Sequence, residues 1–210
     1  MIAPEGRVYV GVSLAGAIVL YFTTIWLFVI GLVVFLFMLQ FFRDFKREIK
    51  KDEKVYLSPA DGKVVFAGPA PDPAQDGINS IKVSIFMNPF NVHVNRIPVD
   101  GKIAHLEHRK GKFLNASLDK ASEENEANTI IIQTSDYRRI TVVQVAGLVA
   151  RRILCYVKPD QEVTQGQRYG FIRFGSRVDM YLPETSALNV KAGDLVQGGL
   201  DIIARRDEFS

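Results

Sequence analysis

A long stretch without a charged residue, between Arg7 and Arg43, constrains this chain more than any other feature. It reads VYVGVSLAGAIVLYFTTIWLFVIGLVVFLFMLQFF and is almost wholly apolar. A membrane-spanning helix needs roughly 20 such residues, so the stretch predicts a transmembrane helical anchor over residues 1–42. One straight helix would exceed the ~30 Å hydrocarbon core. The sequence leaves two arrangements open. The stretch forms either two short helices that meet near Tyr21–Thr24 or one tilted span.

The residues that follow the anchor indicate its orientation. Segment 43–54, RDFKREIKKDEK, carries six lysines and arginines, whereas Arg7 is the basic residue on the other side. The positive-inside rule therefore predicts a cell-membrane protein whose remaining residues lie on the cytoplasmic side. A basic linker directly after a membrane segment also suits contact with anionic lipid headgroups.

Residues 55–210 are predicted to form one compact, multi-stranded β domain, so the fold class is β-dominated α+β. Short runs of β-branched and aromatic residues predict strands at 63–68, 81–87, 127–134, 139–147 and 151–157. Proline and glycine in GPAPDPAQDG predict an exposed loop over 68–77, and 115–126 is the plausible helix. Residues 190–204 read as two short strands, each preceded by a turn.

Composition argues against several kinds of partner and cofactor. The net charge of +3 is too small to indicate a nucleic-acid partner. Cys155 is the single cysteine, so neither an intramolecular disulfide nor a cysteine metal site can form. His105 and His108 would suit a metal if their segment were helical, but no third ligand stands nearby in the sequence. We therefore expect no metal.

Three residues supply the parts of a base-activated nucleophile: Asp61 in SPADGKV, His93 in FNVHVNR and Ser176 in RFGSR. Each also has an ordinary structural interpretation. Asp61 fits a turn, His93 fits a strand, and Gly175-Ser176 fits a β-bulge. Strand alternation places His93 on one face with Asn95, which suits side chains directed into a site. Whether the three meet in space depends on the fold.

Taken in order, FFRDFKREI, SPADGKV, FMNPFNVHVNRIPVDGKI, GKFLNAS, KASEENE and RFGSRVDMYLP resemble the phosphatidylserine decarboxylase family. The likeness is to its short, membrane-anchored form, which includes archaetidylserine decarboxylases, and runs from about residue 41 to the C-terminus. It implies a proenzyme that cuts itself between Gly175 and Ser176, giving a β chain, 1–175, and an α chain, 176–210. Ser176 would become a covalent pyruvoyl cofactor. The mature enzyme would decarboxylate phosphatidylserine to phosphatidylethanolamine, or an archaeal-type analogue to the corresponding amine lipid.

The same resemblance implies roles for individual residues. Asp61 falls on the self-processing aspartate and would orient His93, which would remove the hydroxyl proton of Ser176. Longer members carry two histidines three apart, and here Arg96 stands in the second position. Either His93 serves both maturation and turnover or Arg96 has taken over one task, with Asn95 as a further supporting residue.

The implied partners are a phospholipid in the membrane and the two cleavage chains, which would stay associated through the sheet; a homo-oligomer remains open. A non-enzymatic alternative is a membrane-tethered adaptor or carrier module of lipoyl-like β architecture, because SPADGKVV and VKAGDLVQGG resemble turns of such barrels. That alternative leaves the Gly175-Ser176 site unexplained. A zinc endopeptidase would need a His-x-His pair, which the sequence lacks.

Overall fold

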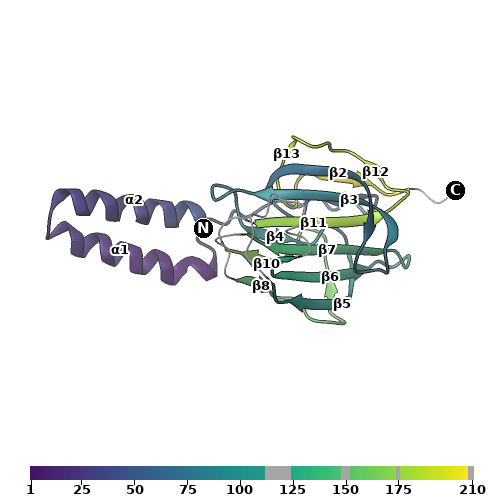
Figure 1. Ribbon diagram of the computed structural model, residues 1–210, viewed down its shortest axis with the longest axis horizontal. Helices are drawn as coiled ribbons and strands as arrows, with labels where there is room; N and C mark the ends of the chain where they lie inside the picture. The colour runs from purple at the N-terminus through teal and green to yellow at the C-terminus, as the bar shows by residue number, and fades with distance from the viewer. Residues whose placement is uncertain (112–123, 148–151, 174–175, 208–210) are drawn as a thin grey trace. The chain divides into compact units, whose positions relative to one another are not determined.

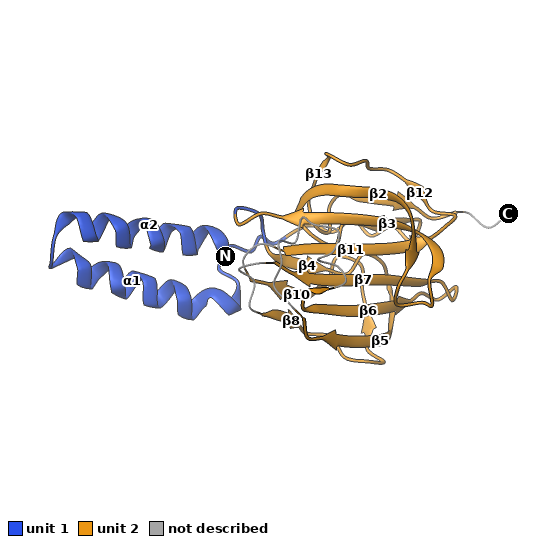
Figure 2. Ribbon diagram, in the orientation of Figure 1, with its two compact units in different colours: residues 1–46, 90–92 blue, residues 47–89, 93–210 orange. Residues whose placement is uncertain are grey.

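The computed structural model describes residues 1–111, 124–147, 152–173 and 176–207. It divides into two compact units, one formed by residues 1–46 and 90–92 and the other by residues 47–89 and 93–210 (Figure 2). Two sequence predictions fall outside the described residues. They are most of the helix predicted at 115–126, and Gly175 of the predicted cleavage site.

The first unit is a pair of helices, α1 (Arg7–Tyr21) and α2 (Ile25–Phe41), preceded by a short 3-10 turn, η1 (Pro4–Gly6) (Figure 1). Thr24 begins α2, because its hydroxyl accepts a hydrogen bond from the Leu27 N–H. The apolar stretch thus forms two helices joined near Tyr21–Thr24. Among the described helices, none is both long and apolar enough to cross a membrane. The predicted transmembrane tether is therefore not supported.

The second unit is dominated by β-strands, as predicted. Its largest sheet has eight antiparallel strands in the order β13-β2-β3-β11-β7-β6-β5-β9. These strands are β2 (Gly62–Asp72), β3 (Ile78–Met87), β5 (Gly101–Arg109), β6 (Ala127–Gln133), β7 (Arg139–Ala146), β9 (Glu162–Val163), β11 (Ser176–Pro183) and β13 (Leu195–Val196). Two three-stranded sheets complete the unit, in the orders β1-β14-β12 and β4-β10-β8. Their strands are β1 (Val55–Leu57), β4 (Val94–Arg96), β8 (Ile153–Cys155), β10 (Arg168–Ile172), β12 (Ala187–Leu188) and β14 (Ile202–Arg205).

The predicted loop at 68–77 is wrong in its first half. Strand β2 continues to Asp72, and Pro69 and Pro71 pair with Ile81 and Asn79 of β3. The two prolines are two residues apart, so their missing N–H groups face the same way. On the side away from β3, β13 pairs with β2 only at Gly62 and Lys63 within the described strands. Proline is tolerated along such an open edge, so the two prolines do not end β2.

Strand alternation gives the large sheet two distinct faces. On β11, Val178, Met180 and Leu182 are buried in the main apolar core. The core also contains residues of the two smaller sheets, among them Tyr169, Ile172 and Ile203. Residues 177, 179 and 181 of β11 point to the other face. The parity of a residue on β11 therefore decides whether its side chain faces the core.

Candidate active site

Ser176 is the first residue of β11, a strand flanked on both sides by partners in the large sheet. It lies opposite Met87 of β3 and Ala146 of β7, and its parity places its side chain on the core face. The side chain is fully buried, and its hydroxyl has no hydrogen-bond partner among the described residues. A buried hydroxyl left in this way is uncommon and marks the position as a candidate for chemistry.

Asp61 lies at the same end of the sheet as Ser176. It immediately precedes β2, and Lys63 of β2 pairs with Phe86 of β3, which in turn pairs with Arg177 of β11. Neighbouring strands are about 4.8 Å apart, so two steps across the sheet separate the backbones of β2 and β11 by about 10 Å. The sheet register thus brings Asp61 and Ser176 to the same end of the large sheet, although they are far apart in sequence.

His93 reaches this region through β4, the strand that it precedes. The Ile172 N–H donates to the His93 carbonyl oxygen at 3.3 Å, which extends the pairing between β10 and β4. The imidazole is fully buried, with its ring centroid 6.3 Å from that of Phe171. Two residues later, the Asn95 side-chain amide lies 3.7 Å from the Met87 sulfur. Because Met87 is opposite Ser176, this contact places the His93–Asn95 segment over the nucleophile's face of the sheet.

A buried chain of amide side chains holds Asn95 in place. Gln144 Nε2 donates to Asn95 Oδ1 at 2.8 Å, and Asn128 Nδ2 donates to Gln144 Oε1 at 3.0 Å. All three residues are 2% exposed or less. Gln144 and Asn128 were missed by sequence reasoning. Their signal was available, since each is a polar residue at a core-facing position of an otherwise apolar strand.

The Asp61 carboxylate has partners other than the one expected. It accepts two hydrogen bonds from Arg47, at 2.6 and 2.7 Å, and a third from the Gly198 N–H at 2.7 Å. Within the described residues, a pairing of Asp61 with His93 is not among its contacts. The guanidinium of Arg47 occupies both carboxylate oxygens of Asp61, and the expectation that Asp61 orients His93 stays a prediction.

Arg96 lies beside the loop that carries Asp61. Its backbone N–H donates to the Pro59 carbonyl oxygen at 2.9 Å, and its side chain donates to the Gly166 carbonyl oxygen at 3.1 Å. The structure thus places Arg96 next to the Asp61 loop and Asn95 next to Met87. The two supporting residues of the β4 strand therefore face different parts of the same region.

The histidines considered as metal ligands do not form a pair. His105 and His108 lie on β5, so the helical spacing that would bring them together is absent. Their nearest acidic partners are Glu107 and Glu126, each 3.6 Å away. No group of three or more histidine, cysteine, aspartate or glutamate residues suited to a metal occurs within the described ranges.

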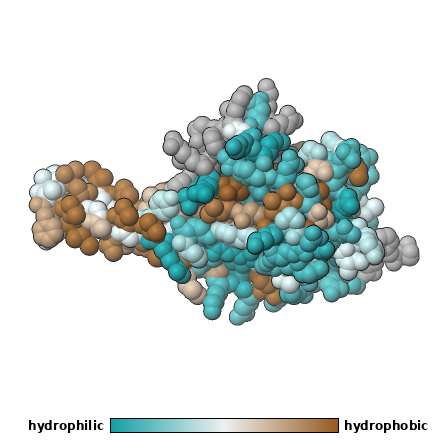
Figure 3. Space-filling model, turned by 90° about the horizontal axis from the view of Figure 1, so that it is seen from below, coloured by the Kyte–Doolittle hydropathy of each residue, from teal (hydrophilic) through white to brown (hydrophobic). Residues whose placement is uncertain are grey.

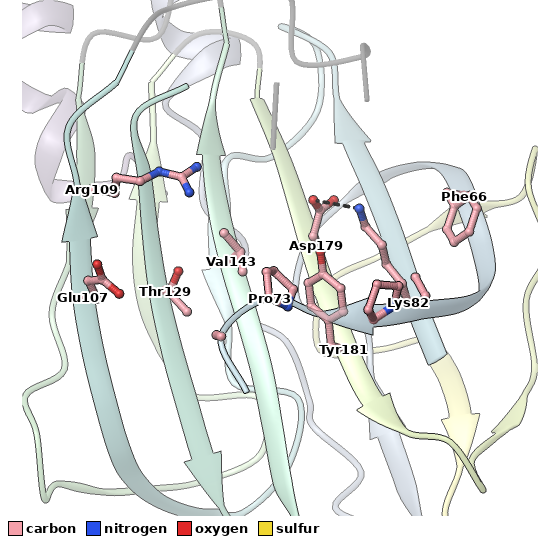
Figure 4. Close-up of a pocket in the computed structure, with 12 residues that line it drawn as sticks. Phe66, Pro73, Lys82, Glu107, Arg109, Thr129, Val143, Asp179 and Tyr181 are labelled. Carbon is pink, nitrogen blue, oxygen red and sulfur yellow. Dashed lines mark ion pairs between the residues drawn. The ribbon is translucent and has the colours of Figure 1, made fainter. Parts of the chain in front are cut away.

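A pocket of about 500 Å³ lies on the opposite face of the large sheet (Figure 4). Its lining includes Asp179 and Tyr181, which alternate on β11 with the core-facing residues. Lys82 bridges the two, with its amine 3.5 Å from the Asp179 carboxylate and 5.4 Å from the centre of the Tyr181 ring. Ser176, Asp61 and His93 do not line this pocket. The candidate active site is therefore on the core side.

Comparison with known proteins decides between the decarboxylase and the adaptor interpretations of the sequence. Residues 34–204 match the family model of phosphatidylserine decarboxylase. This chain belongs to the phosphatidylserine decarboxylase family. The adaptor alternative is not supported, because the family match extends over most of the β domain that it was meant to explain.

Individual members of the phosphatidylserine decarboxylase family agree over most of their length. A phosphatidylserine decarboxylase proenzyme of Ralstonia pickettii (strain 12J) is 53% identical over 175 residues, covering 83% of this chain and 81% of that protein. One from Aromatoleum aromaticum is 47% identical and covers 97% of this chain and 95% of its own length. One from Neisseria meningitidis serogroup C is 48% identical, with 98% and 77% covered.

Proposed function

We propose that this chain is a self-processing, pyruvoyl-dependent phosphatidylserine decarboxylase. It would act as a carboxy-lyase that converts phosphatidylserine, or an archaeal-type analogue, into phosphatidylethanolamine or its counterpart. Family membership and the proenzyme names of the relatives support this proposal. The observation that carries it is Ser176, a buried serine at the start of an internal strand whose hydroxyl has no partner in the described part of the chain.

In maturation, His93 takes the hydroxyl proton of Ser176 while the serine oxygen attacks the carbonyl carbon of Gly175. The new C–O ester bond replaces the C–N amide bond, and the Ser176 nitrogen receives a proton and becomes an amine. Elimination of the Gly175 carboxylate and hydrolysis with loss of ammonia then leave a pyruvoyl group at position 176. Asp61 lies at the same end of the sheet and would support this step indirectly, because its carboxylate is paired with Arg47.

The residues around Ser176 fit the cofactor that this route would form. The group would be made from Ser176, whose buried hydroxyl lacks a partner among the described residues. Asn95 is oriented by Gln144, and its amide nitrogen lies against Met87 with a thioether, a weak acceptor, as its partner. It can therefore donate to a carbonyl oxygen there. Once formed, a pyruvoyl carbonyl supplies an electron sink for the electrons released with CO₂.

Turnover also needs a proton donor for the α-carbon of the substrate after CO₂ leaves. We assign this donor to His93, because its imidazole is buried and Asn95, two residues further on, contacts Met87 opposite Ser176. Arg96 is always charged and so serves better as a binding group for an anion than as an acid. This division gives His93 the proton transfers of both stages.

We further infer that the protein works at the cell membrane, with its β domain on the cytoplasmic side. The helices α1 and α2 expose many apolar side chains, which cover much of their surface in Figure 3. Trp26, the single tryptophan, is 77% exposed on α2. Its fluorescence should shift to shorter wavelength when phosphatidylserine vesicles are added to the purified protein. An unchanged spectrum in the presence of vesicles would contradict membrane insertion of these helices.

An intact mass spectrum of the purified full chain tests the proposed function. We expect two chains, residues 1–175 and 176–210, with the smaller lighter than its serine form by one ammonia. Ser176→Ala should give one uncut chain without decarboxylase activity on phosphatidylserine vesicles. A wild-type chain of full mass, or activity in the Ser176→Ala variant, would overturn the pyruvoyl mechanism. Normal cleavage in His93→Ala would remove His93 from the role of base.

The two cleavage chains are expected to remain associated without a covalent link. Strand β11 of the smaller chain lies between β3 and β7, while β13 pairs with β2 and β14 pairs with β1. All four partner strands belong to residues 1–175. Separation would therefore expose both sides of an internal strand, which is costly because its backbone groups and apolar side chains lose their partners.

A further inference from the structure

We propose that Arg47, in the linker between the helices and the β domain, is a positioning residue for self-processing because it holds the Asp61 carboxylate in place. The inference rests on the proposed function, in which Asp61 serves the cleavage at Ser176. From the charge pattern alone, Arg47 is one of several basic residues of a linker that faces lipid headgroups.

The contact between Arg47 and Asp61 is bidentate and nearly buried. Both terminal nitrogens of Arg47 donate to Asp61, one to each carboxylate oxygen, and the two side chains are 7% and 13% exposed. Parallel hydrogen bonds between a guanidinium and a carboxylate fix the orientation of both groups. Lysine offers a single point charge and cannot reproduce this geometry. The Asp61 side chain therefore has one preferred position as long as Arg47 is present.

Gly198 completes the arrangement from the other side. Its N–H donates to Asp61 at 2.7 Å, and its carbonyl oxygen accepts a hydrogen bond from Arg47. Gly198 lies in residues 176–210, whereas Arg47 and Asp61 lie in residues 1–175. The three residues thus form a clasp between the two proposed cleavage products. The clasp needs no change of partners when the bond at Ser176 is cut.

Near this clasp, the linker packs against two glycine-containing turns of the β domain. Gly166 and Gly199 both adopt positive φ, at 79° and 76°. A Cβ on Gly166 would come within 2.5 Å of Ile49, and one on Gly199 within 3.0 Å of it. The Ile49 side chain thus lies directly over two glycine turns, two residues from Arg47. Such close packing distinguishes Arg47 from a solvated cation that merely follows a membrane segment.

Removal of Arg47 would leave the Asp61 carboxylate in a mostly buried site without its cation. A buried carboxylate that loses its cation is no longer held in one orientation and moves toward water. That movement takes the carboxylate away from its fixed position at the end of the sheet that carries Ser176. Misplacement of a reacting or supporting group by about 1 Å can slow a reaction by about a hundredfold. We therefore expect the cleavage step to slow when Arg47 is lost.

The test compares Arg47→Ala, Arg47→Lys and a matched control, Lys51→Ala, in the full chain made by cell-free synthesis with phosphatidylserine vesicles. Lys51 belongs to the same linker, but its ion pair with Asp100 is long, at 3.8 Å, and exposed. The rate of conversion of the uncut chain into its two products is measured on denaturing gels. We expect Arg47→Ala to slow this rate by about tenfold to a hundredfold, Arg47→Lys to fall between it and wild type, and Lys51→Ala to match wild type.

The cleavage rates are interpreted together with the folding of each variant. Melting temperatures are taken in the uncut Ser176→Ala background, where processing cannot influence them. Wild-type cleavage by a folded Arg47→Ala chain would reduce the clasp to a structural contact, and faster cleavage would make Arg47 a restraint on Asp61. If Arg47→Ala does not fold, Arg47→Lys decides, and a wild-type rate for it would overturn the proposal. If the wild-type chain itself never cleaves, the proposed function fails rather than this inference.

Discussion

Replacing Gln144 by leucine tests whether the buried amide chain stabilises the fold and supports the chemistry at Ser176. Gln144 donates to Asn95 at 2.8 Å and accepts from Asn128 at 3.0 Å. Leucine would leave the Asn95 oxygen and the Asn128 N–H buried without these partners. Each orphaned group costs about 1–3 kcal/mol, and the added apolar burial of leucine offsets about 1 kcal/mol. The free energy of unfolding should therefore fall by about 1–5 kcal/mol.

The assay is urea unfolding in detergent micelles, with the uncut Ser176→Ala chain as reference. A matched control is Gln165→Leu, because Gln165 is also buried and its side chain bonds to backbone groups of Asp52, Val55 and Pro98. Both substitutions should cost several kcal/mol of stability.

Cleavage in the Ser176-containing chain separates the two variants. Gln144→Leu should also slow self-processing, since Asn95 loses the group that orients it, whereas Gln165→Leu should cleave at the wild-type rate while it is folded. A stability loss below about 1 kcal/mol for Gln144→Leu, or equal cleavage rates in the two variants, would refute the reasoning.

Two further predictions concern stability. Met180→Ala removes a fully buried side chain of β11 and should lower the free energy of unfolding by about 2–5 kcal/mol in urea titrations; a loss below about 1 kcal/mol would contradict the core assignment. Burial raises the pKa of Asp136, but hydrogen bonds from Thr134 and Arg206 outweigh it and hold the pKa below 3.8. The stabilisation is therefore present at neutral pH and disappears as pH falls through that lowered pKa. Asp136→Asn should lower the melting temperature at pH 7, and this loss should shrink as the pH falls below 3.8. A loss that does not change with pH would contradict the stabilising role of the contact between Asp136 and Arg206.

Much of the architecture follows from local sequence patterns. Short runs of β-branched and aromatic residues located the strands predicted at 81–87, 127–134 and 139–147, which correspond to β3, β6 and β7. The prolines in 68–77 misled the prediction, because their tolerance depends on which side of β2 lacks a neighbouring strand. That information lies in the order of the strands in the sheet and is absent from the local sequence.

The sequence motifs single out candidate site residues, but they do not predict most of the contacts that those residues make. Ser176 and Asp61 could be singled out from their motifs, and the register of β2, β3 and β11 places them at one end of the sheet. The partner of Asp61 could not be foreseen, because Arg47 looks like one of several linker cations. Its role depends on Gly198, which is 151 residues away in the sequence. Contacts of this kind arise only when distant turns come together.

The prolines of β2 also bear on how copies of this protein can meet. An open strand edge invites the backbone of another chain to add to the sheet, and natural proteins block this with prolines, charges and irregular pairing. Here Pro69 and Pro71 are both exposed, and the pairing of β2 with β3 shifts between Val64 and Phe66. Both features make this edge a poor template for strand addition. A second copy, if it binds, is therefore expected to associate through side-chain surfaces rather than by continuing the sheet.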